Sequence, residues 1–266
     1  MNFLLNEAEL LNHTLESKEI DDTKPTNTFK VLIKYYLKDG KSREEVKKEV
    51  EKFLKNNKKY VYIKWEKTID GMITTIINQN KVKEDNDKYK LLQINSLTIP
   101  RSELETIKAL NDEELEKFAF SILVATRTRN LIASNHSNCF DDKSILYTDA
   151  LLEDEGKKRS KRFIYLLKEK GLVKTPIKIS SVRCEALFIS NDNDEELVIQ
   201  DFNNFALYYL KWKGHNNIIK CKSEKCNTII IKKSNVHKFC GKCADKNKRQ
   251  LDSDRMKKNR ILNSRK

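Results

Sequence analysis

The stretch KKRSKRFIYLLKEKGLV, residues 157–173, decides how the middle of this chain folds. Its apolar residues recur at helical spacing, and Gly171 is the residue type that most often ends a helix in the left-handed conformation. Two apolar runs with strand character follow at 172–179 and 183–189. We therefore predict a helix over 157–170 that leads into a two-stranded hairpin.

Upstream of this stretch the sequence predicts further helices. Residues 115–133 are the most apolar segment of the chain and should form a buried central helix, and residues 144–152 are also helical. Ser102 and Asn111 are each followed three residues later by Glu, a spacing that marks helix starts. Three helices followed by a hairpin are the layout of a winged helix, whose third helix enters the major groove of DNA. We therefore expect a winged-helix-like domain over residues 101–200.

The start of the 157–170 helix is strongly basic. Basic residues at a helix N-terminus oppose the helix dipole, which favours anions there, and DNA phosphates would supply the missing negative charge. An alternative is a solvated basic face in a winged helix that contacts only proteins. The predicted DNA-binding residues are Lys157, Lys158, Arg159, Lys161 and Arg162.

Four cysteines near the C-terminus have the spacing of metal ligands. They form a Cys-x4-Cys pair and a Cys-x2-Cys pair separated by a spacer of hairpin length, so their thiolates can converge on Zn²⁺. Four thiolates close the coordination sphere, which indicates a structural zinc ion in a zinc ribbon over residues 217–245. His237 is an alternative ligand for one position. The predicted metal ligands are Cys221, Cys226, Cys240 and Cys243.

The remaining segments carry no chemical motif. Residues 1–100 are expected to be a helical N-terminal region, and residues 201–216 a connecting helix whose aromatic stripe packs in the core. Residues 246–266 form a basic tail, which we expect to be disordered in isolation and to become ordered on a polyanion. The predicted fold class is mainly α, or α+β, with only 6 Gly and 3 Pro in 266 residues.

Net charge adds an argument about partners. The chain carries a net charge of +14 at pH 7, and residues 101–266 hold 34 Lys and Arg against 23 Asp and Glu. Such a surplus favours a polyanion, most simply nucleic acid. Codon bias from AT-rich coding DNA, which enriches Lys, Asn and Ile, is the alternative explanation.

Other patterns point to a cytoplasmic, non-enzymatic protein. No secretory signal or bilayer-length apolar run is visible, so we expect a cytoplasmic chain without membrane contact, in which cysteines bind metal instead of forming disulfides. There is no P-loop, and none of the four histidines lies in a nickase, recombinase or zincin motif. We therefore expect no enzymatic activity.

Several motifs together resemble a known family. These are Ile99-Pro100-Arg101-Ser102-Glu103-Leu104, residues 116–123, Gly171-Leu172-Val173, residues 201–210, and the cysteine knuckles with their basic tail. The pattern is similar to that of winged-helix proteins with a C-terminal zinc ribbon, carried by phages, plasmids and integrative elements of AT-rich Gram-positive bacteria. That resemblance implies a DNA-binding protein of a mobile element.

The leading hypothesis is therefore a double-stranded-DNA-binding protein in transcriptional or replication control. A second hypothesis, from another class, is an adaptor that docks onto a host protein of the replication or transcription machinery. A third is RNA binding through the ribbon and tail.

Overall fold

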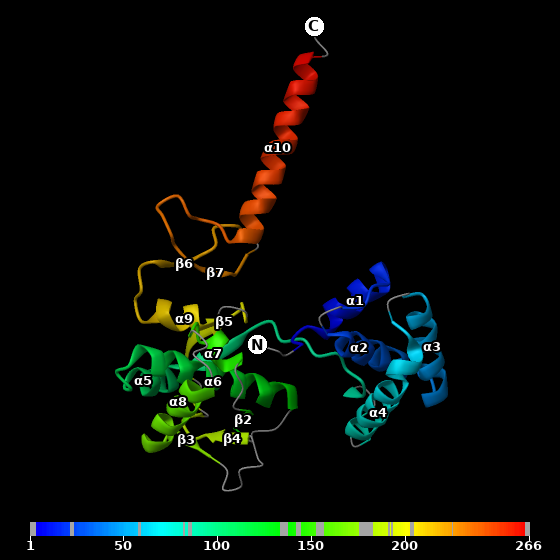
Figure 1. The fold of residues 1–266 in the computed structure, drawn as a ribbon, viewed down its shortest axis with the longest axis horizontal. Coiled ribbons are helices and arrows are strands. Elements are labelled where there is room, and N and C mark those ends of the chain that lie inside the picture. The colour runs from blue at the N-terminus through cyan, green and yellow to red at the C-terminus, as the bar shows by residue number, and fades with distance from the viewer. Residues whose placement is uncertain are drawn as a thin grey trace. The chain divides into compact units, whose positions relative to one another are not determined.

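The computed structural model describes residues 4–263 except 22–23, 58–59, 82, 85–86, 134–137, 142–144, 153–156, 176–182, 191, 193, 203–204 and 225. As predicted, the fold is mainly helical with a few small antiparallel sheets (Figure 1). The chain divides into two compact units, residues 3–95 and residues 96–266. Among the described residues, no helix combines the length and the apolar character needed to cross a membrane.

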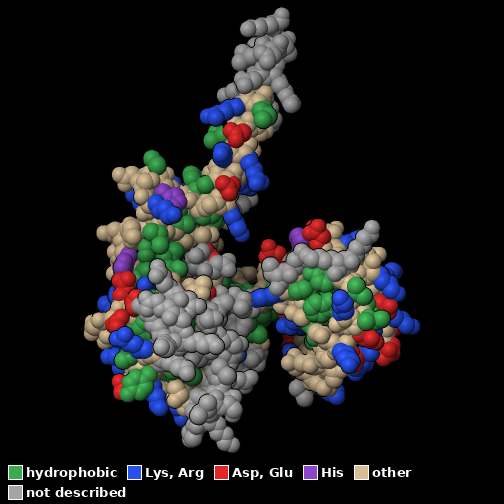
Figure 2. Space-filling model, viewed as in Figure 1, with side chains coloured by type: hydrophobic (Ala, Val, Ile, Leu, Met, Phe, Trp, Pro, Cys, Tyr) green, Lys and Arg blue, Asp and Glu red, His purple; other side chains and the backbone are tan. Residues whose placement is uncertain are grey.

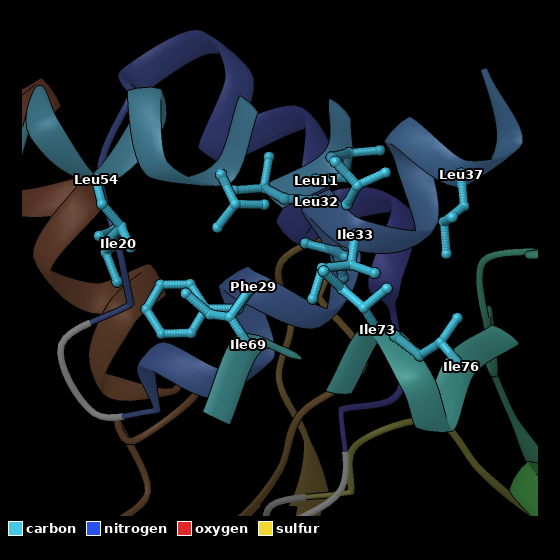
Figure 3. Close-up of a cluster of buried hydrophobic side chains, with 13 residues drawn as sticks. Leu11, Ile20, Phe29, Leu32, Ile33, Leu37, Leu54, Ile69, Ile73 and Ile76 are labelled. Carbon is cyan, nitrogen blue, oxygen red and sulfur yellow. The ribbon is translucent and has the colours of Figure 1, made fainter. Parts of the chain in front are cut away.

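The N-terminal unit is a small helical bundle. Its helices are α1 (Glu7–Ser17), α2 (Pro25–Lys38), α3 (Arg43–Lys55) and α4 (Tyr62–Asn80). Phe29 and Ile33 of α2 pack with Ile69 and Ile73 of α4 in one buried apolar cluster (Figure 3). The apolar residues of α2, α3 and α4 recur at helical spacing, in line with the helical region expected over residues 1–100.

A buried ion pair holds α1 in this unit. Glu7 is fully buried, and its carboxylate accepts hydrogen bonds from Lys34 Nζ (2.6 Å) and from the backbone N–H of Leu92 (2.8 Å). Lys30 Nζ lies 2.9 Å from the other carboxylate oxygen. Burial raises the pKa of Glu7, but these donors outweigh it and the pKa lies below its ordinary value. The charged carboxylate therefore ties α1 to α2 and to the chain leaving the bundle.

The C-terminal unit alternates helices with short strands. In chain order they are β1 (Leu97–Pro100), α5 (Arg101–Lys108), α6 (Glu113–Ala133), β2 (Cys139–Asp141), α7 (Ile145–Asp149), α8 (Lys157–Glu169), β3 (Val173–Lys174), β4 (Arg183–Ala186), β5 (Glu195–Ile199), α9 (Phe205–Trp212), β6 (Ile218–Lys220), β7 (Ile229–Ile231) and α10 (Gly241–Asn263). Three antiparallel sheets result, with strand orders β1-β5, β2-β4-β3 and β6-β7.

Helix α6 is the centre of this unit, as its apolar sequence predicts. The Phe118 ring lies 4.5 Å from that of Tyr147 in α7 and 5.5 Å from that of Phe163 in α8, measured between centroids. Phe120, two residues along, stacks on Tyr209 of α9 at 5.0 Å. The predicted central helix is therefore confirmed, because its two flanks bury α7 and α8 on one side and α9 on the other.

Two helix starts differ from the expectation. Helix α6 is capped by Asp112, whose carboxylate accepts hydrogen bonds from the N–H groups of Glu114 and Leu115, both 3.1 Å. Asn111 precedes the cap, with a φ of 53°. Ser102 lies inside α5, and its hydroxyl donates to Asp192 (2.7 Å) instead of capping the helix. The cap of α6 is thus formed by the next residue along the chain, whereas the Ser102 hydroxyl bonds a side chain that is distant in sequence.

The three-stranded sheet is larger than the predicted hairpin. β3 and β4 pair antiparallel, as predicted, and their connection lies outside the described residues. β2, between α6 and α7, adds a third strand along β4. Helix α8 ends at Glu169, and Gly171 just beyond it has a φ of 72°, with Leu172 N–H donating back to Leu167 O (2.9 Å).

The C-terminal segment, which we expected to be disordered in isolation, is helical in the structure. Residues 241–263 form the continuous helix α10, which begins inside the second cysteine pair and crosses the boundary expected at residue 246. Its thin apolar content suggested disorder, but the first turn of the helix is fixed by the neighbouring cysteine cluster.

Candidate metal centre

Four thiols converge at the junction between the last hairpin and α10. The sulfur atoms of Cys221, Cys226, Cys240 and Cys243 all lie within 4.8 Å of one another. The Sγ atoms of Cys226 and Cys240 are 3.7 Å apart. A tetrahedral site with Zn–S bonds of about 2.3 Å has sulfur–sulfur edges of about 3.8 Å. The donor set and its spacing therefore fit one tetrahedrally coordinated divalent ion.

The first cysteine pair lies on the hairpin formed by β6 and β7. Cys221 follows β6 directly, and its N–H donates to Thr228 O (2.9 Å) across the hairpin. Cys226 N–H donates to Ser223 O (2.9 Å), which folds the Cys-x4-Cys segment into a turn. The wider spacing of this pair is thus accommodated by a hydrogen-bonded turn that brings both sulfurs to one side.

The second cysteine pair is the start of a helix. Cys240 N–H donates to the sulfur of Cys221 (3.3 Å), a contact that stabilises a thiolate. Gly241 is the first residue of α10, and Ala244 N–H donates to Cys240 O (2.9 Å) in the first helical turn. Cys243 therefore contributes its sulfur from within the helix, and the site joins a sheet to a helix.

Two of the thiols, Cys226 and Cys243, have pKa values shifted in opposite directions. Hydrogen bonds from the side chain and the backbone of Thr228 lower the pKa of Cys226 to about 7. Ser223 lowers the pKa of Cys243, but its contacts with Cys240 and its desolvation raise it to about 12. Negative charge on the first sulfur thus opposes ionisation of the next. A divalent cation removes this opposition, because metal binding deprotonates thiol ligands.

The alternative ligand is placed elsewhere. His237 Nδ1 accepts a hydrogen bond from the N–H of Lys233 (3.2 Å), within the turn that follows β7. Within the part of the chain that the structure describes, the group of possible metal ligands consists of the four cysteines. The set predicted from the spacing is therefore brought together, and His237 does not belong to it.

Helix α9 connects the hairpin to the core below it. The Tyr208 hydroxyl donates to Asn227 O (3.0 Å), next to Cys226, and accepts the N–H of Asp201 (3.0 Å). Ile229 of β7 is buried, as is Tyr209 on the inner side of α9. The aromatic stripe predicted over residues 201–216 packs in the core, because Phe202, Phe205, Tyr208 and Tyr209 are buried and Trp212 is half-buried.

All five predicted DNA-contacting residues belong to α8. The apolar face of this helix, including Phe163 and Leu167, is buried against α6. The Arg162 side chain is exposed, as is that of Lys168 in the last turn. Lys157, Lys158, Arg159 and Lys161 lie in the first turns of α8, and their side chains are outside the described part of the structure.

Comparison with known proteins adds no relative: no protein-family model, no curated protein and no solved structure matches this chain. The function therefore has to be argued from the arrangement of the residues themselves.

Proposed function

We propose that this chain is a non-enzymatic DNA-binding protein of a mobile element, which binds duplex DNA through α8 and carries a structural zinc ion. The observation that carries the proposal is the order of elements from α6 to β4. Helix, strand, two helices and two strands follow one another, and the strands form a sheet in the order β2-β4-β3. A winged helix has this succession, with its third helix available to the major groove.

Helix α8 has the properties that such a third helix requires. One face packs on the aromatic residues of α6 and α7, through Phe163. The first six residues of α8 include five Lys or Arg, of which Arg162 has a described side chain and is exposed. The positive end of the helix dipole disfavours basic residues at a helix N-terminus. Phosphate oxygens would bind both these cations and the N–H groups of the first turn, which would offset the repulsion.

We assign the four-cysteine site to Zn²⁺. Zinc is the usual ion of closed tetrahedral thiolate sites, and it has no redox chemistry of its own. Cys221, Cys226, Cys240 and Cys243 would hold it and leave no open coordination position for a substrate. The ion would supply stability, because a module of this size buries too little apolar surface to fold alone.

Charge reversal in α8 tests the DNA-binding proposal. The variant combines Arg159→Glu, Lys161→Glu and Arg162→Glu, and its control places Glu at Lys38, Lys48 and Lys52, which are exposed in the N-terminal unit. Each lost phosphate contact costs about fivefold in affinity at physiological salt, so three cost on the order of 10²-fold. Fluorescence anisotropy with a labelled duplex measures both variants, and circular dichroism checks that each remains folded.

The outcomes separate the three functional hypotheses. A selective loss in the α8 variant supports the proposal, whereas equal affinity in both variants contradicts it. If the wild-type chain binds no duplex and a pull-down recovers one host protein, the adaptor hypothesis replaces it. Tighter binding to RNA than to DNA of the same sequence would favour the third hypothesis.

A further inference from the structure

Helix α10 is a long helix that exposes its side chains. Every described side chain from Ala244 to Met256 is exposed, including the apolar Leu251 and Met256. Figure 2 shows basic side chains distributed along this helix. Helices in globular proteins usually bury an apolar face, which the described side chains of α10 from Ala244 to Met256 do not form. A helix of this kind needs another reason for its sequence and another source of stability.

The basic residues of α10 are sorted by face. At 3.6 residues per turn, five of its eight basic positions fall within an arc of about 80°. The three Asp residues of the helix, at 245, 252 and 254, all lie outside this arc. The five positions, which we call the α10 basic stripe, are Lys242, Lys246, Arg249, Lys257 and Arg260.

We propose that the α10 basic stripe binds the phosphate backbone of duplex DNA and that the cysteine site anchors the helix for this contact. This inference deepens the proposed DNA-binding function and rests on it. The stripe extends over about 27 Å of helix, at a rise of about 1.5 Å per residue. Duplex DNA carries one phosphate per about 1.7 Å of axis when both strands are counted, so a row of cations of this length has phosphates within reach along it.

The apolar residues of α10 argue against a membrane surface as the partner. A helix that lies in a membrane interface gathers its apolar residues on one face. The four large apolar positions of α10, which are 251, 256, 261 and 262, spread over about 220° of the helix circumference at about 100° per residue. The helix therefore offers a lipid surface no coherent apolar face, whereas its charge complements a polyanion.

The cysteine site explains how an unpacked helix can be held. Starting a helix is unfavourable, because the first turn fixes several residues for one hydrogen bond. In α10 that first turn is Cys240 to Ala244, closed by the Ala244 N–H to Cys240 O bond of 2.9 Å. Metal coordination by Cys240 and Cys243 would fix this same turn. The stripe begins at Lys242, between these two cysteines. A bound metal would therefore hold the turn from which the stripe extends.

Two variants of equal charge test the stripe. The stripe variant combines Lys246→Gln, Arg249→Gln and Lys257→Gln, and leaves Lys242 intact because it adjoins the cysteines. The control neutralises the three basic positions of the opposite face, Lys248, Arg255 and Lys258, also with Gln. Gln is nearly as good a helix former as Lys and Arg, so neither change should melt the helix. Duplex affinity is measured for both over a series of salt concentrations.

The stripe variant should lose three phosphate contacts. Its log–log salt slope should be shallower than that of the wild type by about 2.7, with an affinity loss on the order of 10²-fold at physiological salt. The control should lose less than about tenfold, since it changes only the long-range field. Equal slopes and equal losses in the two variants would overturn the inference, as would a preference of the wild type for duplex RNA.

This comparison separates the inference from the function on which it rests. If the α8 charge reversal abolishes binding and the stripe variant behaves as its control, the proposed function stands and the stripe inference fails. If the wild-type chain binds no duplex, both fail. Chelation tests the anchor: it should weaken duplex binding by the wild type and leave the stripe variant nearly unchanged. An equal loss in both would exclude the anchoring role.

Discussion

Replacement of one cysteine tests the metal centre most directly. We choose Cys226→Ser, because the Cys226 sulfur lies 3.7 Å from that of Cys240 and so occupies an edge of the expected tetrahedron. Serine has a shorter side chain, and its hydroxyl is a weak ligand for zinc compared with a thiolate. The matched control is Cys139→Ser, which changes a cysteine in β2, outside the cluster.

The size of the effect follows from the number of ligands. Structural zinc sites in small peptides contribute about 10–16 kcal/mol at neutral pH. Divided over the four sulfurs that converge here, one thiolate contributes about 3 kcal/mol, or about 10²-fold in metal affinity. Because Cys240 N–H also donates to Cys221 Sγ (3.3 Å), the remaining three ligands stay grouped. We therefore expect weakened binding and not its complete loss.

The assay combines stoichiometry with spectroscopy. Competition against a chromogenic chelator should give one Zn²⁺ per wild-type chain and per Cys139→Ser chain, and about 10²-fold weaker binding for Cys226→Ser. Co²⁺ added in place of zinc should give the strong visible absorption of tetrahedral thiolate coordination, reduced in the Cys226 variant. The reasoning is refuted if Cys226→Ser retains wild-type affinity, or if the control loses as much.

Two further predictions concern buried charged groups. Glu7→Gln should destabilise the N-terminal unit by about 2 kcal/mol, because it leaves the partly buried Lys34 without its counter-ion. The pKa of Glu7 in the folded state lies below its ordinary value of 4.5. The stability that Glu7 contributes is therefore complete above pH 4.5 and is lost as the pH falls through the folded pKa. Urea unfolding at several pH values should show this dependence in the wild type and not in the variant. Tyr209→Phe removes the 2.8 Å hydrogen bond to the buried Glu116 and should cost about 2 kcal/mol, seen as a melting temperature about 5 °C lower. An unchanged melting temperature would show that Lys213 alone satisfies this carboxylate.

The sequence predicts those elements that are specified by residues close to one another in the chain. α6 is recognised from its continuous apolar residues, and α3 from the capping box of Ser42 and Glu45, which the structure confirms in both directions. The metal ligands are likewise predictable, because thiolate coordination requires close pairs of one residue type. In each case the information lies within a few residues of the element that it specifies.

The elements that escaped prediction depend on distant partners. α1 is held by Glu7, whose partner Lys34 is 27 residues away and whose other donor, Leu92, is 85 residues away. β5 pairs with β1, from the other end of the unit, and β2 is a three-residue strand that is defined only by its pairing with β4. α10 was expected to be disordered because its own residues give little reason for a helix, whereas its first turn is set by cysteines of the preceding site.

Composition alone does not explain how the charges of this chain are arranged. A bias toward lysine codons would place cations without regard to geometry, and protein surfaces would then pair them with nearby acids. The N-terminal unit shows that pattern: Lys41 lies 2.6 Å from Glu49, and Lys47 lies 2.6 Å from Asp70. In α10 the basic stripe contains no acid, although three Asp residues occur in the same helix. The feature that requires a physical cause is therefore the gathering of five of the eight basic positions of α10 within about 80° of the helix, which contact with a phosphate backbone would explain.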